Sequence, residues 1–252
     1  MAKWPGLAAV GLMPPGASGG VTDRIEVGGV GLSYRRWGRP GPRPAVLLHA
    51  LGEEAGAWKD VGSVLALDRP VYAFDCRGHG ASDHTPDYSF ELLRDDVAGA
   101  VETLGLHQVS IVGHSLGGMV AYLLAAKRPA WLTRLVLEDA PAPLPVVPPR
   151  PTPRRPSADL PFDWQALVEL YRQRDQPDPQ WWAALDQIEV PTLAIGGGTT
   201  SHVDEDQLAD MARRIPSCAL TTIDAGHHIH QNRPDEFLAV VRPFLAGDDG
   251  GH

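Results

Sequence analysis

Cysteine is scarce in this sequence: Cys76 and Cys218 are the only two among 252 residues. Two cysteines are too few for a disulfide framework, and neither stands in the Cys-x-x-Cys spacing of a zinc or redox motif. We therefore expect two reduced thiols, as is usual for a cytoplasmic protein.

Long apolar runs are also missing. No stretch approaches the roughly 18 apolar residues that a membrane-spanning helix needs, so we expect no association with a membrane. The first twenty residues hold one lysine and a short apolar run, but Pro5, Gly6 and Gly11 interrupt that run. We therefore predict a flexible lead-in over residues 1–23 rather than a signal peptide, and a disordered tail over residues 247–252.

Basic residues are fewer than acidic residues in this sequence. The 22 lysines and arginines against 31 aspartates and glutamates give a net charge of -9. A nucleic-acid-binding protein needs a basic surface, so we expect no nucleic-acid partner. The remaining composition, 43% hydrophobic and 21% charged, is ordinary for a globular protein, and the length suffices for one large domain.

Short apolar runs alternate with longer stretches of helical periodicity. The predicted strands span residues 24–27, 32–37, 45–49, 70–75, 109–113, 132–139, 192–196 and 219–224. Glycines separate the first two, which indicates a hairpin. The main helices are predicted over residues 90–104, 116–127, 204–215 and 234–245. Buried strands that alternate with helices predict an α/β fold, with a mostly parallel eight-stranded sheet covered by helices on both faces.

One segment, residues 141–188, contains no predicted strand. It opens with PAPLPVVPPRPTPRRP, which is too rich in proline to sustain a helix or a central strand, and two short helical stretches follow at 163–174 and 179–187. Insertions at the carboxyl ends of parallel strands overlie the ligand crevice. We therefore predict a small helical lid, inserted into a core of residues 24–140 and 189–246; a solvated linker is the alternative.

The strongest local motif is Gly113-His114-Ser115-Leu116-Gly117, which lies between a predicted buried strand and a predicted helix. The glycines permit a sharp turn that exposes the Ser115 hydroxyl at the strand end. The N-terminus of the following helix favours negative charge that develops there. This context predicts Ser115 as a nucleophile.

A serine hydroxyl needs a general base to become a good nucleophile. Three histidines, His227, His228 and His230, follow the last predicted strand. A histidine-rich tract can also bind a metal ion, but no convincing set of carboxylates or cysteines accompanies this one. We therefore expect the base among these residues, and no metal site.

Five segments occur along the chain in the order that one known family shows. They are LLHALG at 47–52, DCRGHGASD at 75–83, GHSLGG at 113–118, VPTLAIGGG at 190–198 and AGHHIHQNRPDEF at 225–237. On these residues the chain resembles an α/β-hydrolase, and the resemblance covers nearly everything from residue 24 to residue 245.

The resemblance implies the α/β-hydrolase fold and gives roles to individual residues. His227 stands at the family's position for the base, because a glycine precedes it and Pro-x-x-Phe follows at residues 234–237. The backbone N–H groups of Leu51 and Leu116 would form the oxyanion hole, which stabilises charge that appears only in the transition state.

The resemblance also raises a problem with the third member of the triad. Many α/β-hydrolases carry an aspartate in the loop after strand 192–196, where this chain has Thr200. Asp139 offers a replacement, because neighbouring strands lie only about 4.8 Å apart and a subset of the family uses the end of the strand before. Asp139-Ala140-Pro141 resembles the pattern of that subset. We predict Asp139 as the carboxylate that orients His227.

Glu138 and Asp204 remain alternatives for this acid. Strand alternation places the side chains of Glu138 and Asp139 on opposite sides, so one is the acid and the other is structural. Asp204 is expected to cap the helix that follows it. Without a carboxylate of its own, the loop at residues 199–202 is free to contact substrate.

These observations predict a carboxylesterase-like serine hydrolase, which cleaves a small-molecule ester, lactone, thioester or amide through an acyl-enzyme. Serine at the nucleophile position disfavours an epoxide hydrolase or a haloalkane dehalogenase, because such relatives use aspartate there. One alternative is a non-hydrolytic enzyme on the same scaffold: a cyclase, a C–C bond hydrolase or lyase, or a cofactor-free perhydrolase. Another is a catalytically silent binding protein.

Substrate contacts are expected from five residues: His114, Trp164, Trp182, Thr200 and His228.

We expect no cofactor. The glycines at 196–198 follow a strand but lack the Gly-x-Gly-x-x-Gly spacing of a dinucleotide site. Arg150, Arg154 and Arg155 are expected to form a solvated charge run. The expected partner is a small-molecule substrate, and the expected state is a monomer or a homodimer.

Overall fold

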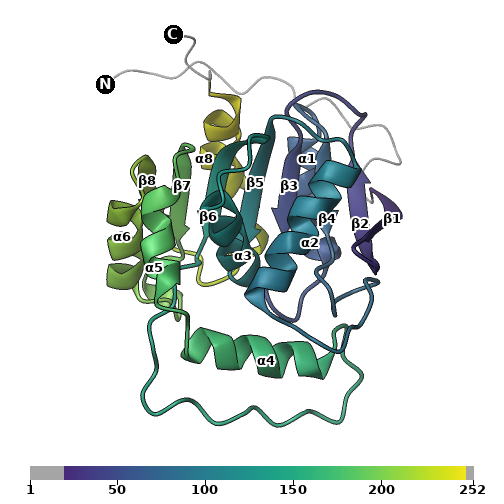
Figure 1. The fold of residues 1–252 in the computed structure, drawn as a ribbon. Helices are drawn as coiled ribbons and strands as arrows, with labels where there is room; N and C mark the ends of the chain where they lie inside the picture. The colour runs from purple at the N-terminus through teal and green to yellow at the C-terminus, as the bar shows by residue number, and fades with distance from the viewer. Residues whose placement is uncertain (1–19, 248–252) are drawn as a thin grey trace.

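The computed structural model describes residues 20–247. Most of the predicted lead-in and tail, namely residues 1–19 and 248–252, therefore lies outside the described residues. One sheet forms the centre of the described chain, with helices on both of its faces (Figure 1).

The sheet has eight strands. They are β1 (Val21–Val27), β2 (Val30–Trp37), β3 (Ala45–Leu48), β4 (Val71–Phe74), β5 (Val109–His114), β6 (Leu132–Glu138), β7 (Thr192–Gly196) and β8 (Cys218–Thr222). Their order across the sheet is β1-β2-β4-β3-β5-β6-β7-β8. The β1–β2 and β2–β4 pairs are antiparallel and the remaining five pairs are parallel, which confirms the predicted fold class.

Eight α-helices are found within residues 20–247. They are α1 (Lys59–Leu65), α2 (Phe90–Thr103), α3 (Leu116–Ala125), α4 (Trp164–Asp175), α5 (Gln180–Ala184), α6 (Glu205–Arg214), α7 (Ile229–Asn232) and α8 (Pro234–Ala246). Helix α2 begins after Ser89, whose hydroxyl accepts a hydrogen bond from the Leu92 N–H, and α8 begins with proline in its first turn. The sequence prediction lacked α1 and α7, which are too short to show a clear helical period.

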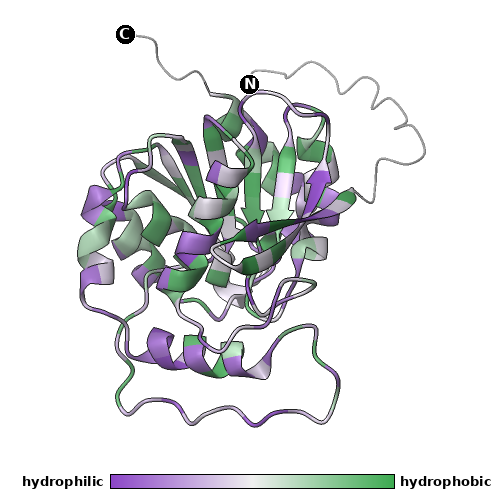
Figure 2. Cartoon of the chain, turned by 45° about the vertical axis from the view of Figure 1, so that its right-hand side comes forward, coloured by the Kyte–Doolittle hydropathy of each residue, from purple (hydrophilic) through white to green (hydrophobic). Residues whose placement is uncertain are grey.

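Alternation along the strands divides the apolar core into two layers. In β3, Val46 and Leu48 belong to the layer beneath α2, α3 and α6, whereas Ala45 and Leu47 belong to the layer beneath α1 and α8. Because the sheet is buried on both faces, its central strands appear in the sequence as continuous apolar runs. Figure 2 shows the same distribution, with hydrophobic strands inside and mixed helices outside.

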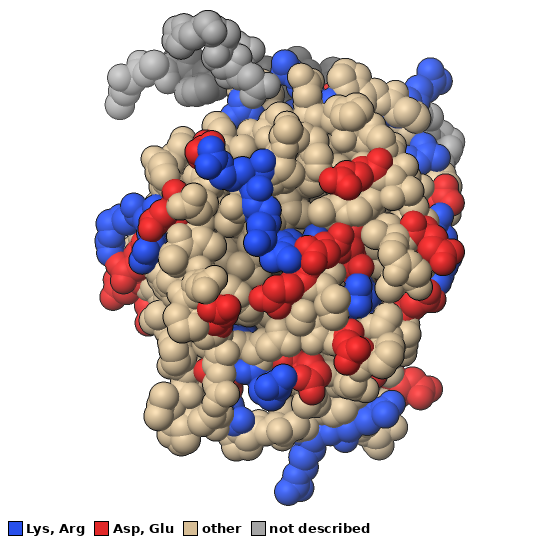
Figure 3. Space-filling model, in the orientation of Figure 1, with Lys and Arg blue, Asp and Glu red and all other residues tan. Residues whose placement is uncertain are grey.

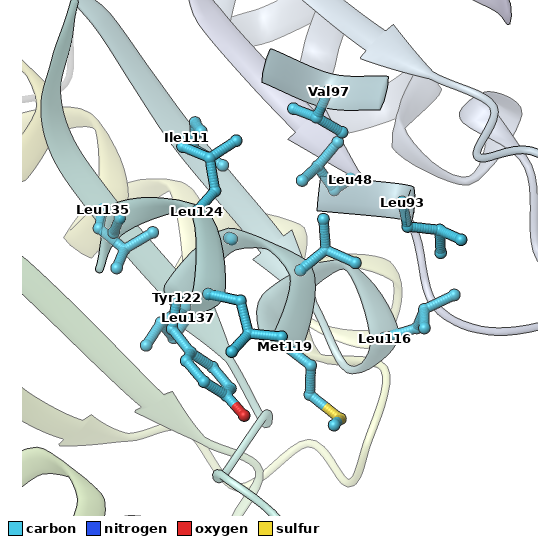
Figure 4. Close-up of a cluster of buried hydrophobic side chains, with 14 of the residues drawn as sticks. Leu48, Leu93, Val97, Ile111, Leu116, Met119, Tyr122, Leu124, Leu135 and Leu137 are labelled. Carbon is cyan, nitrogen blue, oxygen red and sulfur yellow. The ribbon is translucent and has the colours of Figure 1, made fainter. Parts of the chain in front are cut away.

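Helix α3 lies in the middle of the first layer, and all ten of its residues are buried. In Figure 4, Leu116 and Met119 of this helix lie in one apolar cluster with Leu48 of β3. The helix approaches β3 closely because Gly117 has no side chain: a Cβ there would lie 2.2 Å from the Leu48 carbonyl oxygen. This packing fixes the turn between β5 and α3.

The chain between β6 and β7 crosses one end of the sheet. After β6 it runs without helix or strand as far as Asp163, and α4 then lies beyond the end of the central strands (Figure 1). The Asp163 N–H donates to the Gly78 carbonyl at 2.6 Å, and the Gly80 N–H donates to the Pro161 carbonyl at 2.8 Å. These bonds tie residues 141–188, called the cap segment below, to the loop after β4.

The core begins earlier than predicted. Val21, Thr22 and Asp23 pair with β2 and so belong to the sheet rather than to a lead-in. These three residues are exposed, so no apolar alternation marks them in the sequence; the ladder with β2 holds them. At the other end, the Gly247 carbonyl accepts a hydrogen bond from Arg134, which places that residue against the core rather than in the tail.

Both cysteines are free thiols: Cys76 is buried and Cys218 is partly buried. Burial raises the pKa of Cys218 to about 11 and that of Cys76 further, which makes both thiols poor nucleophiles at neutral pH. Within residues 20–247, no helix combines the length and the apolar character needed to cross a bilayer.

Candidate active site

Ser115 occupies the sharp turn between β5 and α3. Its backbone has φ 51 and ψ -111, a combination that a non-glycine residue adopts only under strain. A Cβ on Gly113 would lie 2.4 Å from the Gly117 carbonyl oxygen, so the turn leaves no room for a side chain there. The Ser115 N–H donates to the Glu138 carbonyl at 3.0 Å, which links the turn to the end of β6.

Asp139 follows β6 and lies directly against His227. The side chain is 1% exposed, and its Oδ2 lies 2.7 Å from Nδ1 of His227. An ionised carboxylate only accepts hydrogen bonds, so Nδ1 carries the proton and Nε2 is left as the basic nitrogen. Burial favours the protonated acid, but hydrogen bonds from His227, Ser201 and the Gly197 N–H outweigh it and hold the pKa of Asp139 below its ordinary value.

The loop after β7, which lacks an aspartate at Thr200, instead holds the acid from β6. The Gly197 N–H donates to Oδ1 of Asp139 at 2.9 Å, and the Ser201 hydroxyl donates to Oδ2 at 2.5 Å. Thr200 donates to Asp224 at 3.2 Å. The role of Ser201 did not follow from the sequence, because it depends on the approach of two segments 62 residues apart.

The two alternative acids are occupied elsewhere. Glu138 is fully buried on the opposite side of the strand end, where it accepts from the His230 N–H at 2.8 Å and from Nδ1 of His230 at 2.9 Å. Asp204 caps α6 by accepting from the N–H groups of Asp206 and Gln207, as the sequence predicted. Of the three candidates, Asp139 is the one hydrogen-bonded to His227.

A buried histidine cluster lies beneath this contact. Nε2 of His114 lies 2.8 Å from the His227 carbonyl oxygen, and the ring of His230 stacks on Trp58 with centroids 3.9 Å apart. Burial disfavours a charged imidazole, but the carboxylates of Glu138 and Glu53 outweigh it and raise the pKa of His114. Despite burial, His230 and His114 hold the pKa of Glu138 below its ordinary value.

Ligand atoms of His114, Glu138 and His230 lie within 4.8 Å of one another, a spacing that a metal ion could bridge. Both oxygens of Glu138 already accept from Nδ1 of His230. The cluster is therefore described most simply as buried charge pairing that supports the His227 backbone.

Glu53 joins the two loops that flank Ser115, and the sequence contained no signal for it. One carboxylate oxygen accepts from the Ala50 N–H at 3.2 Å, and the other accepts from the Gln231 side chain at 2.6 Å. Oε2 of Glu53 also lies 3.6 Å from Nδ1 of His114. Although burial acts in the opposite direction, these partners hold the pKa of Glu53 well below its ordinary value.

Ser115 borders two cavities. The larger, of about 310 Å³, is also lined by Asp139, His227, His202 and residues 140–146 of the chain after β6. The smaller, of about 30 Å³, contains Leu51 and Leu116. The residues predicted for the nucleophile, the base, the acid and the oxyanion hole thus line two cavities that share Ser115.

None of the five residues expected to contact substrate lines either cavity that Ser115 borders. His114 is fully buried. The Trp182 indole N–H donates to the Pro143 carbonyl, Thr200 binds Asp224, and Nε2 of His228 lies 3.6 Å from Glu53. Trp164 starts α4 and lines neither cavity.

Two other side chains line the larger cavity instead. His202, in the loop expected to contact substrate, has its ring centroid 4.2 Å from that of His227. Arg174 comes from α4, and no motif in the sequence pointed to it.

The fold and this arrangement define a class of protein. A sequence model of the family described as alpha/beta hydrolase fold matches residues 44–173. The chain belongs to this family.

Curated relatives and solved structures agree with that assignment. The chain is 26% identical to the sn-1-specific diacylglycerol lipase ABHD11 of Mus musculus, over 85% of either chain. It is 26% identical to an esterase of Mycobacterium tuberculosis, over 88% of either chain. The enol-lactonase from Burkholderia xenovorans LB400 superposes with a TM-score of 0.79 at 25% identity, covering 89% of this chain and all of that one. At a coarse level these relatives support ester hydrolysis.

Proposed function

We propose that this protein is a serine hydrolase that cleaves a small-molecule ester, lactone, thioester or amide through an acyl-enzyme. The observation that carries the proposal is the 2.7 Å contact between Asp139 and His227, beside Ser115 and in the same cavity. A serine, a histidine and a buried carboxylate in this relation are what acyl transfer requires.

Each residue has a distinct part in the proposed reaction. Ser115 Oγ attacks the carbonyl carbon while Nε2 of His227 takes its proton, and Asp139 stabilises the resulting imidazolium. The backbone N–H groups of Leu51 and Leu116 stabilise the oxyanion. His227 then protonates the leaving group, and water attacks the acyl-enzyme with His227 again as the base.

The two cavities suggest where the leaving group and the acyl group of a substrate bind. His227 lines the larger cavity and must reach the leaving group in order to protonate it, so the leaving group occupies that space. The acyl group enters the smaller cavity, between Leu51, Phe90 and Leu170, whose volume favours a short acyl chain. The cap segment supplies walls to both cavities and acts as the lid.

A substrate panel tests this proposal. Short-chain esters, lactones, thioesters and amides are incubated with the wild type and with Ser115→Ala, and the products are identified by mass spectrometry. The expected result is release of a free acid that depends on Ser115. Turnover that persists in Ser115→Ala contradicts the proposal. A product whose mass shows that no water was incorporated favours a non-hydrolytic enzyme.

A further inference from the structure

Arg174 brings a guanidinium group beside Ser115. It is the last residue but one of α4, its side chain is 29% exposed, and it lines both cavities that Ser115 borders. The guanidinium carbon lies 4.2 Å from the ring centroid of Tyr171, one turn earlier in the helix, which fixes where the cation is held.

This cation shares its carboxylate partner, because Asp175 pairs with Arg150 as well as with Arg174. Nε of Arg174 is buried and has no hydrogen-bond partner among the described residues. The neighbouring carboxylate, Asp175, lies 4.0 Å away but is engaged by Arg150, which donates to it from its backbone N–H, from Nε and from Nη2. The exposed part of this side chain, and not the buried Nε, faces the cavities, and its terminal N–H groups offer donors to an anion there.

The acids that line the larger cavity do not supply that acceptor. Asp139 is saturated by His227, Ser201 and Gly197, and Asp204 is turned to the start of α6. Arg150 and His202 add two further basic side chains to the same lining. Because Asp175 pairs with Arg150, Arg174 is the arginine of this lining that has no carboxylate of its own, although the chain as a whole has a net charge of -9. Figure 3 shows basic and acidic side chains around a hollow at the end of the molecule where α4 crosses.

We propose, on the basis of the function proposed above, that Arg174 binds an anionic group on the leaving-group part of the substrate. The anion is a carboxylate or a phosphate, both of which offer paired oxygens to a guanidinium fork. Arg174 lines both cavities, but the smaller one, of about 30 Å³, has no room for an anionic group. The leaving-group side is therefore assigned, because the larger cavity of about 310 Å³ holds both Arg174 and His227. The substrate class is thus an ester or lactone of a hydroxy acid or of a phosphorylated alcohol.

A pair of chromogenic acetates tests the inference. One releases 4-nitrophenol and the other releases 5-hydroxy-2-nitrobenzoate, so they differ by one carboxylate on the leaving group. We expect the ratio of kcat/KM, carboxylate ester over neutral ester, to fall about 10- to 100-fold in Arg174→Gln, as for loss of a hydrogen bond between charged groups. Arg174→Lys, which keeps the charge without the fork, should give an intermediate ratio.

Arg154→Gln is the matched control, because Arg154 lies in the same cap segment, is exposed and lines neither cavity. It should leave the ratio at the wild-type value. An unchanged ratio in Arg174→Gln overturns the inference, whereas hydrolysis of both esters by Ser115→Ala overturns the proposed function and not the anion site.

A binding measurement tests the anion site separately from the proposed hydrolase function, because it needs no catalysis. Calorimetric titration of the wild type with 5-hydroxy-2-nitrobenzoate, 4-nitrophenol and inorganic phosphate shows which anion binds. We expect the carboxylate or phosphate to bind at least tenfold more tightly than 4-nitrophenol. The inference is contradicted if 5-hydroxy-2-nitrobenzoate binds no more tightly than 4-nitrophenol and phosphate does not bind. This test uses the wild type, so it holds even if Arg174→Gln fails to fold.

Discussion

Nδ1 of His227 lies 2.7 Å from Oδ2 of Asp139, although the two residues are 88 positions apart. The strand order brings them together: β6 lies between β5, which ends at the nucleophile, and β7, whose following loop binds the carboxylate. His227 therefore has a carboxylate partner despite the threonine at position 200, and this partner follows the strand next to the one that ends at Ser115.

Asp139→Asn should reduce kcat by about 10⁴-fold, because an amide does not hold the productive tautomer of His227 or stabilise its charged form. The measurement is steady-state hydrolysis of an activated ester. Asp204→Asn should change kcat by less than about tenfold, because asparagine caps a helix as well as aspartate does. Similar losses in both variants would count against Asp139 as the acid.

Glu138→Gln should lower the free energy of unfolding by about 3 kcal/mol, because it removes a fully buried carboxylate that accepts from the N–H and Nδ1 of His230 and lies beside His114. Urea denaturation at neutral pH measures this. Glu102→Gln, an exposed position in α2, should stay within about 0.5 kcal/mol of the wild type. Equal stability of the two variants would show that the buried pair is not stabilising.

Low pH should lower the free energy of unfolding, because it protonates Asp139 and Glu138. Their pKa values are lower in the folded chain than in the unfolded chain, so their contribution is present above about pH 4 and is lost as the pH falls below that value. The free energy of unfolding of Asp139→Asn should therefore depend less on pH between 5 and 3 than that of the wild type. Parallel pH curves for the two proteins would contradict this assignment.

The contribution of His114 to stability should have the opposite dependence on pH. Its pKa is raised in the folded chain, so its contribution is complete below about pH 6.5, the ordinary value, and is lost as the pH rises through the folded value. His114→Gln should therefore cost more stability at pH 5.5 than at pH 9 when measured by urea unfolding. A cost that is independent of pH would mean that the pKa of His114 is the same in the folded and the unfolded chain.

Gly117→Ala should destabilise the protein by about 2–3 kcal/mol, because a Cβ would lie 2.2 Å from the Leu48 carbonyl and a buried helix and strand cannot separate without cost. Gly41→Ala is the control, since the nearest atom to its Cβ would be at 3.6 Å. Thermal unfolding of both variants provides the comparison. A Gly117→Ala protein as stable as Gly41→Ala would refute the close packing of α3 on β3.

The sheet and the turn at Ser115 could be predicted from local sequence, whereas the role of Asp139 followed from the family resemblance and stays a prediction. Apolar runs marked the buried strands because both faces of the sheet are covered. Ser115 and His227 stood in short motifs, and Asp139 was a candidate because adjacent strands of a parallel sheet end side by side.

The residues that line the cavities and connect the loops could not be predicted in this way. Trp182 binds the Pro143 carbonyl through its indole, and only the folded cap segment shows that it lines neither cavity. Glu53 binds Gln231, which is 178 positions away, and Arg174 lines the same cavities as Ser115, which is 59 positions away. Each of these contacts depends on how loops pack together, which neither hydrophobic periodicity nor motif spacing in the sequence indicates.

The most direct test of the proposed chemistry is labelling with a fluorophosphonate, followed by peptide mass spectrometry of the folded protein. A single adduct on Ser115 is predicted for the wild type, with none in Ser115→Ala and much slower labelling in Asp139→Asn, because the phosphonate requires the serine that His227 and Asp139 activate. Absence of an adduct in the folded wild type, or an adduct on another residue, would contradict the account.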